Sequence, residues 1–172
     1  MSRAFVKEGT GELEPLPDLP VSPHPNYVTP RGLAALRARL AEVQGELARL
    51  RARPERLDKL PEAAAERDIR YLEARLRTAM PVDPAAHDLT AVAFGLRVTV
   101  VDEAGAEATY EITGEDEADA SLGRIAPHSP LARALMGAEV GDEVTWRRPA
   151  GPMVLEVVRI DRPADDADDP PA

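Results

Sequence analysis

The chain has 172 residues, of which 44% are hydrophobic and 3% aromatic, so it can bury a modest core built mainly from aliphatic side chains. It has no cysteine, which excludes disulfides and thiolate chemistry, and its three histidines, His24, His87 and His128, lie in no metal-ligand spacing. The net charge is −10, yet residues 29–79 hold 12 Lys and Arg against 8 Asp and Glu, which argues against a uniformly basic nucleic-acid binder.

The N-terminal segment predicts a tail. Residues 1–26 contain five prolines, all from position 15 onward, and proline prevents helix formation and interrupts strand pairing. The first residues lack the apolar stretch of a signal peptide, and no apolar run approaches the roughly 20 residues needed to span a bilayer. We therefore expect a disordered tail over residues 1–26 and a location in the cytoplasm.

Residues 27–82 carry the periodicity of two helices. Thr29 is a suitable N-cap and Pro30 a suitable first residue for a helix that ends or kinks at Pro54. Its apolar residues follow the alternating three and four spacing of a coiled-coil seam: Leu33, Leu36, Leu40, Val43, Leu47 and Leu50. A second helix begins at Pro61, and its seam is Ala65, Ile69, Leu72, Leu76 and Ala79. The short connection between them predicts an antiparallel helical hairpin.

Residues 88–162 change to a strand-like pattern and predict a small α+β domain. Ser129 is a suitable N-cap for one short helix that runs through Met136. The expected strands are Val92–Val101, Ala108–Ile112, Val144–Arg148 and Met153–Ile160. The fold class is therefore α+β, with the hairpin first and this domain second. The Asp- and Pro-rich residues 163–172 predict a disordered acidic tail.

Three features of the chain could carry a function, since it has no phosphate loop, dinucleotide fingerprint or nucleophile elbow. The first is the acidic run at residues 115–119, which is either a binding site or a solvated loop. The second is the helix after Ser129, whose hydroxyl has no His and Asp partners at a triad spacing. Its apolar residues Pro130, Leu131 and Leu135 face either the core or a partner.

The third feature is the hairpin turn, which carries the carboxylates Glu55, Asp58 and Glu62. They alternate with Arg56 and Lys59, so the local charge is close to neutral. A magnesium site relies on carboxylates whose charge is not compensated, and the pattern therefore favours a solvated turn.

Four stretches of the C-terminal half form one ordered set of motifs: Ile112–Asp119, Arg124–Ile125, Ser129–Gly137 and Val140–Val144. In this order they resemble the C-terminal domain of the Gre family of transcription elongation factors, GreA and GreB, in which an FKBP-like domain follows a helical hairpin. The N-terminal stretches Met1–Phe5 and Val21–Leu33 are similar to the GreB side of the family. The resemblance covers nearly the whole chain except the middle of the hairpin.

The resemblance implies a partner and a docking surface. In Gre factors the C-terminal domain docks on the rim of the secondary channel of bacterial RNA polymerase, and the hairpin enters the channel. On this chain the implied RNA polymerase-binding residues are Asp116, Glu117, Asp119, Ser129, Pro130, Leu131, Ala132 and Leu135.

The resemblance fails at the hairpin tip. The family's tip runs Gly-Asp, a short spacer, then Ser-Glu-Asn-Ala, and its acids help the polymerase hold a second Mg²⁺ and orient the water that cleaves backtracked RNA. Residues 51–68 contain no match. This hairpin is also shorter than the family's by about two heptads, or about 10 Å of reach. We therefore expect a channel binder without strong cleavage stimulation, which is not itself an enzyme and has no cofactor, the Mg²⁺ belonging to the polymerase.

Two other interpretations remain open. One is a GreB-type cleavage factor whose acids have moved to Glu55, Asp58 and Glu62. The other is a peptidyl-prolyl isomerase, suggested by the FKBP-like domain. It is disfavoured because only three aromatic residues could line its pocket: Phe94, Tyr110 and Trp146.

The first helix also carries a basic face off its seam, made of Arg37, Arg49, Arg51 and Arg53. This face either touches nascent RNA, DNA or an acidic polymerase surface within the complex, or is an ordinary solvated face. Nothing in the sequence indicates oligomerisation or a membrane partner. We therefore expect a monomer that engages one polymerase.

Overall fold

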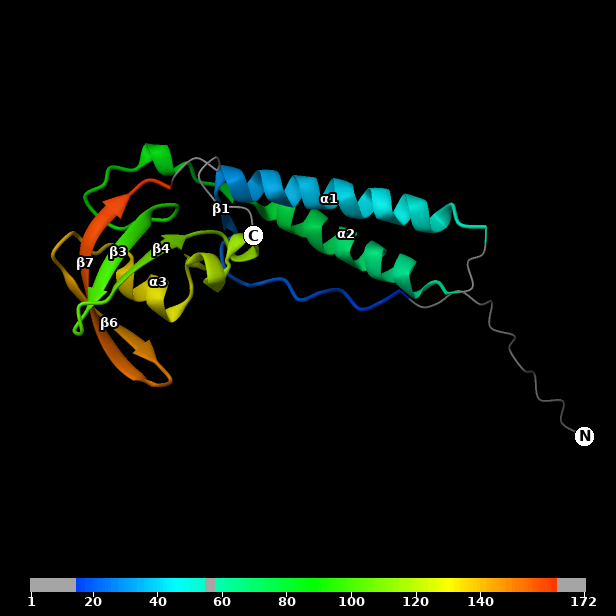
Figure 1. Cartoon of the computed structure of the whole chain (residues 1–172). Helices are drawn as coiled ribbons and strands as arrows, with labels where there is room; N and C mark the ends of the chain where they lie inside the picture. Colours follow the sequence, from blue (N-terminus) through cyan, green and yellow to red (C-terminus); the bar gives the residue numbers. More distant parts are fainter. Residues whose placement is uncertain (1–14, 55–57, 164–172) are drawn as a thin grey trace, which may run out of the picture.

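The computed structural model describes residues 15–54 and 58–163, and over these residues a helical hairpin extends from one end of an α+β domain (Figure 1). The hairpin pairs α1 (Pro30–Arg51) with α2 (Leu60–Thr78). Thr29 caps α1 as predicted, because its hydroxyl accepts a hydrogen bond from the backbone N–H of Gly32 at 2.9 Å. With 22 residues, α1 is about 33 Å long at 1.5 Å per residue.

The predicted seams of the two helices form the core of the hairpin. The buried members are Leu36, Val43, Leu47, Leu50, Ala65 and Leu72, and the half-buried members that pack against them are Leu33, Leu40, Ile69, Leu76 and Ala79. Every position predicted from the heptad spacing therefore lies in the contact between the helices, which confirms the antiparallel hairpin.

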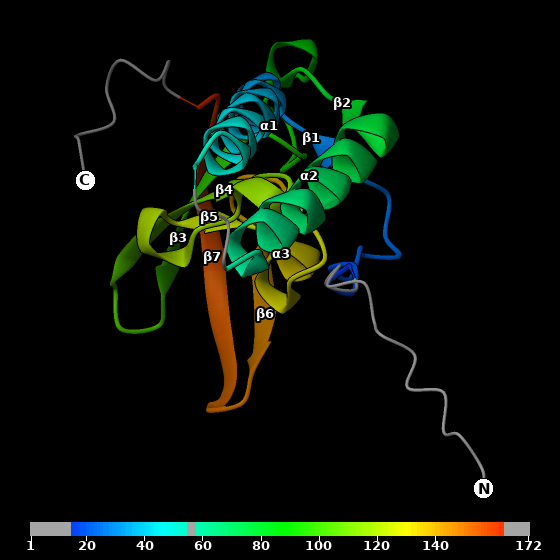
Figure 2. The same cartoon turned by 90° about the vertical axis from the view of Figure 1, so that its right-hand side faces the viewer.

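The N-terminal tail prediction is wrong from residue 15 onward. Residues 15–26, here called the strap, run beside α2 without regular secondary structure (Figures 1 and 2). Arg70 of α2 holds the strap, since its guanidinium donates to the carboxylate of Asp18 at 2.6 Å and to the carbonyl of Leu16 at 2.8 Å. Proline excludes regular structure but not an ordered path, which is why composition misled the prediction. Residues 1–14 and 164–172 lie outside the described residues, so the remaining tail predictions are untested.

Two short strands close the base of the hairpin. β1 (Tyr27–Val28) and β2 (Met80–Pro81) pair in parallel, so the chain enters α1 and leaves α2 at the same point. The buried side-chain amide of Asn26 strengthens this base, because it donates to the carbonyl of Arg75 at 2.8 Å and to the hydroxyl of Thr78 at 3.1 Å.

The C-terminal domain is a curled five-stranded sheet around one short helix. The strands are β3 (Arg97–Asp102), β4 (Glu107–Ile112), β5 (Arg124–Ile125), β6 (Glu143–Arg148) and β7 (Gly151–Asp161). Their order is β5-β4-β3-β7-β6, with β4 and β5 parallel and the other pairs antiparallel. The helix is α3 (Pro130–Leu135), and short 3-10 turns occur at Pro84–Ala86, Glu115–Glu117 and Ala120–Leu122. This architecture confirms the α+β class.

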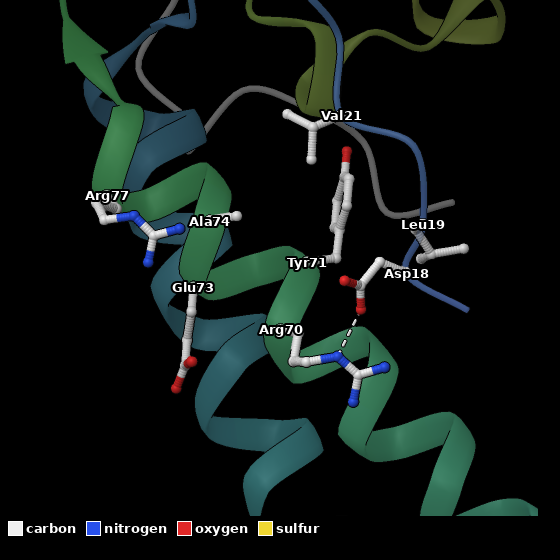
Figure 3. A pocket seen from close by; sticks show the side chains of 8 residues that line it. All are labelled: Asp18, Leu19, Val21, Arg70, Tyr71, Glu73, Ala74 and Arg77. Carbon is white, nitrogen blue, oxygen red and sulfur yellow. Dashed lines mark hydrogen bonds and ion pairs between the residues drawn. The ribbon is translucent and has the colours of Figure 1, made fainter. Parts of the chain in front are cut away.

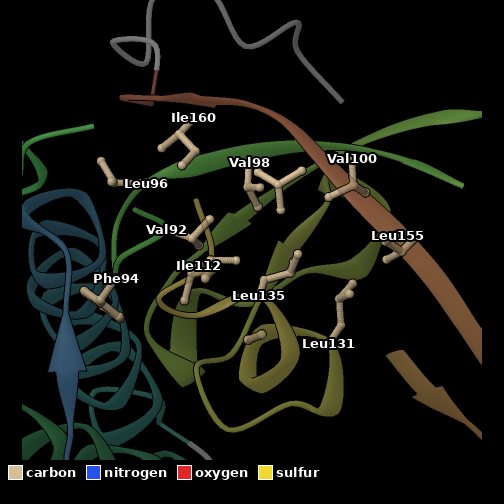
Figure 4. Close-up of a cluster of buried hydrophobic side chains, with 13 residues drawn as sticks. Val92, Phe94, Leu96, Val98, Val100, Ile112, Leu131, Leu135, Leu155 and Ile160 are labelled. Atoms are coloured by element: carbon tan, nitrogen blue, oxygen red, sulfur yellow. The ribbon is translucent and has the colours of Figure 1, made fainter. Parts of the chain in front are cut away.

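The domain core lies between α3 and the inner face of the sheet (Figure 4). The predicted first strand begins later than expected, at Arg97 instead of Val92. Gly95 has φ 85°, a left-handed conformation that a strand does not contain, so the chain turns there. Val92, Phe94 and Leu96 are nevertheless buried, because this loop packs into the core. Their apolar character reflects burial and not strand structure.

Candidate functional site

The acidic run lies against the base of the hairpin. Asp116, in the turn Glu115–Glu117, accepts hydrogen bonds from the hydroxyl of Tyr71 at 2.6 Å and from Nε of Arg75 at 2.5 Å. Glu115 adds a longer contact of 3.4 Å to Arg75. The Arg75 side chain is only 2% exposed, so its charge depends on these two carboxylates for compensation.

Glu117 joins the same turn to the start of α1. Its carboxylate accepts hydrogen bonds from the hydroxyl of Thr29 at 2.7 Å and from Nε of Arg31 at 2.6 Å. Arg31 also donates to Glu111 of β4 at 2.6 Å. Burial acts to lower the pKa of Arg31, but the carboxylates of Glu111 and Glu117 outweigh it and raise that pKa above the ordinary value.

These contacts form one interface between the two parts of the molecule, here called the joint. It contains Thr29, Arg31, Tyr71 and Arg75 from the hairpin, with Glu111, Glu115, Asp116 and Glu117 from the C-terminal domain. Desolvation, followed by the hydrogen bond to Asp116, raises the pKa of the Tyr71 phenol to about 12. The acidic run is therefore a structural connection, an arrangement that the sequence did not predict.

Two of the three acids predicted to dock a partner are thus already engaged within the chain. Asp116 and Glu117 have side chains 16% and 8% exposed, and their oxygens face hairpin donors. Asp119 differs, because it is exposed and accepts hydrogen bonds from the hydroxyl and then the backbone N–H of Ser121, which lower its pKa. Among the three predicted docking acids, Asp119 is the one that is exposed to solvent and forms no hydrogen bond with the described residues of the hairpin.

The predicted docking helix needs a similar correction. Ser129 caps α3 as expected, accepting from the backbone N–H of Ala132 at 3.2 Å. Leu131, Ala132 and Leu135 are 4%, 0% and 0% exposed and belong to the domain core (Figure 4). They cannot contact a partner while the domain is folded, so the core alternative holds for these side chains.

An exposed part of this helix does face an open pocket. Pro130 is exposed. It lines a pocket of about 400 Å³ that lies between α3 and β6. The lining residues are Pro130, Arg133, Ala134, Thr145 and Arg147. Sequence reasoning missed Thr145 and Arg147, although the alternation along β6 placed both on one face of that strand.

The candidate carboxylates at the hairpin tip have different environments. Asp58 is exposed, and its carboxylate accepts from the backbone N–H of Leu60 at 2.9 Å at the start of α2. Glu62 is 7% exposed within the helical pair. Glu55 lies outside the described residues. Asp58 and Glu62 thus form no exposed acidic pair that could present a metal site.

The basic face of α1 remains accessible. Arg37, Arg49 and Arg53 are exposed, and no carboxylate among the described residues forms an ion pair with them. Arg51 is also exposed but pairs with Glu66 of α2 at 2.6 Å. The structure thus leaves both interpretations of this face open.

Residues 15–54 and 58–163 contain no group of three or more His, Asp or Glu side chains placed to hold a metal ion. None of the helices in these residues combines the length and the apolar character that a membrane span requires. The three aromatic residues considered for an isomerase pocket come from different elements: Phe94 from the loop before β3, Tyr110 from β4 and Trp146 from β6. Phe94 contacts Tyr27 at the hairpin base, with ring centroids 5.8 Å apart, whereas the guanidinium of Arg148 covers Trp146 on β6.

Comparison with known proteins identifies the family. Residues 86–162 match the model of the family described as "Transcription elongation factor, GreA/GreB, C-term". The transcription elongation factor GreB of Xanthomonas axonopodis is 39% identical over 155 residues, covering 78% of this chain and 89% of that protein. The chain therefore belongs to the GreA/GreB family of transcription elongation factors.

Matches to GreA proteins are shorter. GreA of Alkalilimnicola ehrlichii is 46% identical over 94 residues, covering 54% of this chain and 60% of the relative. Across three such GreA relatives the chain spans about half of their length. A solved GreA/GreB structure from Nitrosomonas europaea has a TM-score of 0.40 at 22% identity and covers 79% of this chain and 98% of that chain.

The GreB alignment also records a difference in length. Its 155 positions cover 78% of the 172 residues, or about 134 residues, so about 20 aligned positions have no residue in this chain. This deficit is larger than the two heptads, about 14 residues, by which the hairpin is expected to be short. The alignment does not place the deficit, so the shortened hairpin stays a prediction.

Proposed function

We propose that this protein binds bacterial RNA polymerase at the rim of the secondary channel, inserts its hairpin and modulates transcription without strong cleavage stimulation. The observation that carries the proposal is the hairpin itself, which extends from the C-terminal domain of a GreA/GreB family member (Figure 1). In this role the protein is a regulator and not an enzyme, it acts as a monomer, and any catalytic Mg²⁺ belongs to the polymerase.

The docking surface proposed here differs from the one expected from sequence. It comprises the exposed Asp119 and the pocket between α3 and β6, with Arg133 and Arg147 on its wall. Two arginines on a chain of net charge −10 favour an acidic or carbonyl-rich patch of the partner. Leu131, Ala132 and Leu135 support this surface from the core.

The tip geometry supports the absence of strong cleavage. One carboxylate oxygen of Asp58 accepts a hydrogen bond from the backbone N–H of Leu60 at the start of α2, and Glu62 is buried. Metal-assisted hydrolysis needs carboxylates that project from the tip and reach an ion at about 2.1 Å.

The test is RNA cleavage in a backtracked elongation complex, first with this protein alone and then in competition with a GreB factor. We expect no stimulation alone and a dose-dependent inhibition of GreB. Replacing both Arg133 and Arg147 with Ala should weaken the inhibition at least about tenfold, as loss of two charged contacts at an interface does. The matched control is Arg39→Ala with Arg159→Ala, since both arginines are exposed and lie outside the pocket.

Cleavage by the protein alone would contradict the proposal and favour the relocated acids. In that event Asp58→Ala and Glu62→Ala variants, together with Glu55→Ala, identify the carboxylate responsible. Absence of any competition would show that the family resemblance extends to the fold but not to this partner.

A further inference from the structure

The strap contacts both parts of the molecule and crosses the joint between them. Its first anchor is on the hairpin, where Arg70 of α2 binds the carboxylate of Asp18 (Figure 3) and also the carbonyl of Leu16. Its second anchor is on the C-terminal domain, where the hydroxyl of Ser22 donates to Glu115 at 2.8 Å.

A third anchor lies farther along the strap. The ring of His24 stacks on the ring of His128, with centroids 3.8 Å apart and an angle of 22° between the planes. His128 directly precedes the N-cap of α3, so this anchor is also on the C-terminal domain. The chain then enters the hairpin base at Asn26, whose amide binds Arg75 and Thr78.

Between its anchors the strap does not pack tightly on α2. A groove of about 320 Å³ separates the two, lined by Asp18, Leu19, Val21, Arg70, Tyr71, Glu73, Ala74 and Arg77 (Figure 3). Val21 is 46% exposed, and most of the strap is exposed as well. The strap is therefore held by a few separate contacts and not by continuous packing along its length. This arrangement fits a segment that connects the two parts of the molecule better than one that forms a layer of the core.

The sequence of the strap suits this role. Its five prolines restrict the unfolded segment, so fewer contacts are needed to order it, and a Pro-rich segment acts as a semi-rigid spacer. The Arg70 anchor directly precedes Tyr71 of the joint on α2, so the strap is tied to the hairpin beside the joint as well as to the C-terminal domain.

We propose that the strap is a tie that fixes the angle between the hairpin and the C-terminal domain, and that its release lets the hairpin turn about the joint. Turning the hairpin would separate the Arg70 anchor from the Glu115 and His128 anchors. Most of the strap is exposed and it has no regular secondary structure, so we expect it to open more easily than the packed helices of the hairpin. The tie thus sets the direction in which the hairpin points.

The test uses the full chain without any partner, so it is independent of the proposed function. The chain has no cysteine, and spin labels can therefore be placed at Glu46→Cys on α1 and Glu103→Cys in the turn after β3. Pulsed electron paramagnetic resonance then measures the distance between hairpin and domain. We expect one narrow distance distribution for the parent chain. In the variant that combines Asp18→Ala, Ser22→Ala and His24→Ala, we expect a broad distribution.

In a separate sample, a single label at Val21→Cys reports whether the strap has been released, through a rise in label mobility. Released strap with an unchanged distance distribution would overturn the proposal, because the joint alone would then set the angle. Unchanged mobility in the triple variant would overturn it too, because the three anchors would not hold the strap. Val21→Ala is the control in the distance experiment, since this side chain makes no hydrogen bond and its loss should leave the distribution narrow.

Discussion

At the residue scale, the joint shows how a buried charge is accommodated. Arg75 is almost fully buried, and its guanidinium is compensated by Asp116 and Glu115. Gly32 makes room for the neighbouring contact, because a Cβ built there would lie 2.6 Å from a carboxylate oxygen of Glu117. The glycine lowers the helix propensity of α1 but lets the acidic run approach Thr29.

Tyr71 provides a titration that reports on the joint. Its pKa is raised to about 12 from 10.0, chiefly by burial and then by the hydrogen bond to Asp116. The folded chain therefore holds this proton more tightly than the unfolded chain does. The resulting stability is fully present below pH 10 and is lost as the pH rises from about 10 to about 12.

We expect the ultraviolet tyrosinate titration of the parent chain, minus that of Tyr71→Phe, to give a curve with its midpoint near pH 12. A difference curve centred on the ordinary value of 10.0 would show that the phenol is not enclosed at the joint. Tyr110→Phe is the control for the loss of one of the three tyrosines.

At the element scale, the hairpin was predictable and the joint was not. Every seam position that heptad spacing predicted lies between α1 and α2, because an amphipathic helix buries the same face along its whole length, although the spacing did not identify Tyr71, which also packs there. The acidic run gave no such signal, since a carboxylate that pairs with a residue some 40 positions earlier looks like a solvated one in sequence. Likewise, the apolar character of Leu131 and Leu135 fits a core position and an interface position equally well, and only the fold shows that both are core residues.

Helix α2 offers a matched pair of leucines to test the hairpin core. Leu72 is 7% exposed in the seam, whereas Leu60 is 54% exposed at the first turn. We expect Leu72→Ala to lower the free energy of unfolding by about 2–5 kcal/mol, because it leaves a cavity between the helices, and Leu60→Ala to change it by less than about 0.5 kcal/mol. Urea denaturation followed by circular dichroism measures both, and equal effects would contradict the assigned seam.

At the scale of the whole molecule, the hairpin has little core of its own and relies on the C-terminal domain. Two hydrophobic clusters are separate, one in the hairpin and one in the domain. What connects them is mainly polar, namely the ion pairs of the joint and the anchors of the strap. A two-helix element of this size is marginally stable alone, so these polar contacts should decide whether the molecule unfolds in one step.

The single tryptophan, Trp146 in β6, allows the two parts to be followed separately. Its fluorescence reports the C-terminal domain, while far-ultraviolet circular dichroism is dominated by α1 and α2. For the parent chain we expect the two signals to change at the same urea concentration. Combining Arg31→Ala with Arg75→Ala should move the helical transition to lower urea and leave the tryptophan transition in place, because the joint loses both arginines.

The matched control for this experiment replaces Arg39 and Arg51, whose ion pairs are exposed, and exposed pairs contribute little to stability. This control should keep the transitions coincident. If the joint variant also unfolds in one step, the strap and the strand pair β1–β2 must be sufficient to couple the two parts. If the parent chain already shows two transitions, the joint positions the hairpin without stabilising it, and the direction of the hairpin becomes a property that a binding partner can change at small energetic cost.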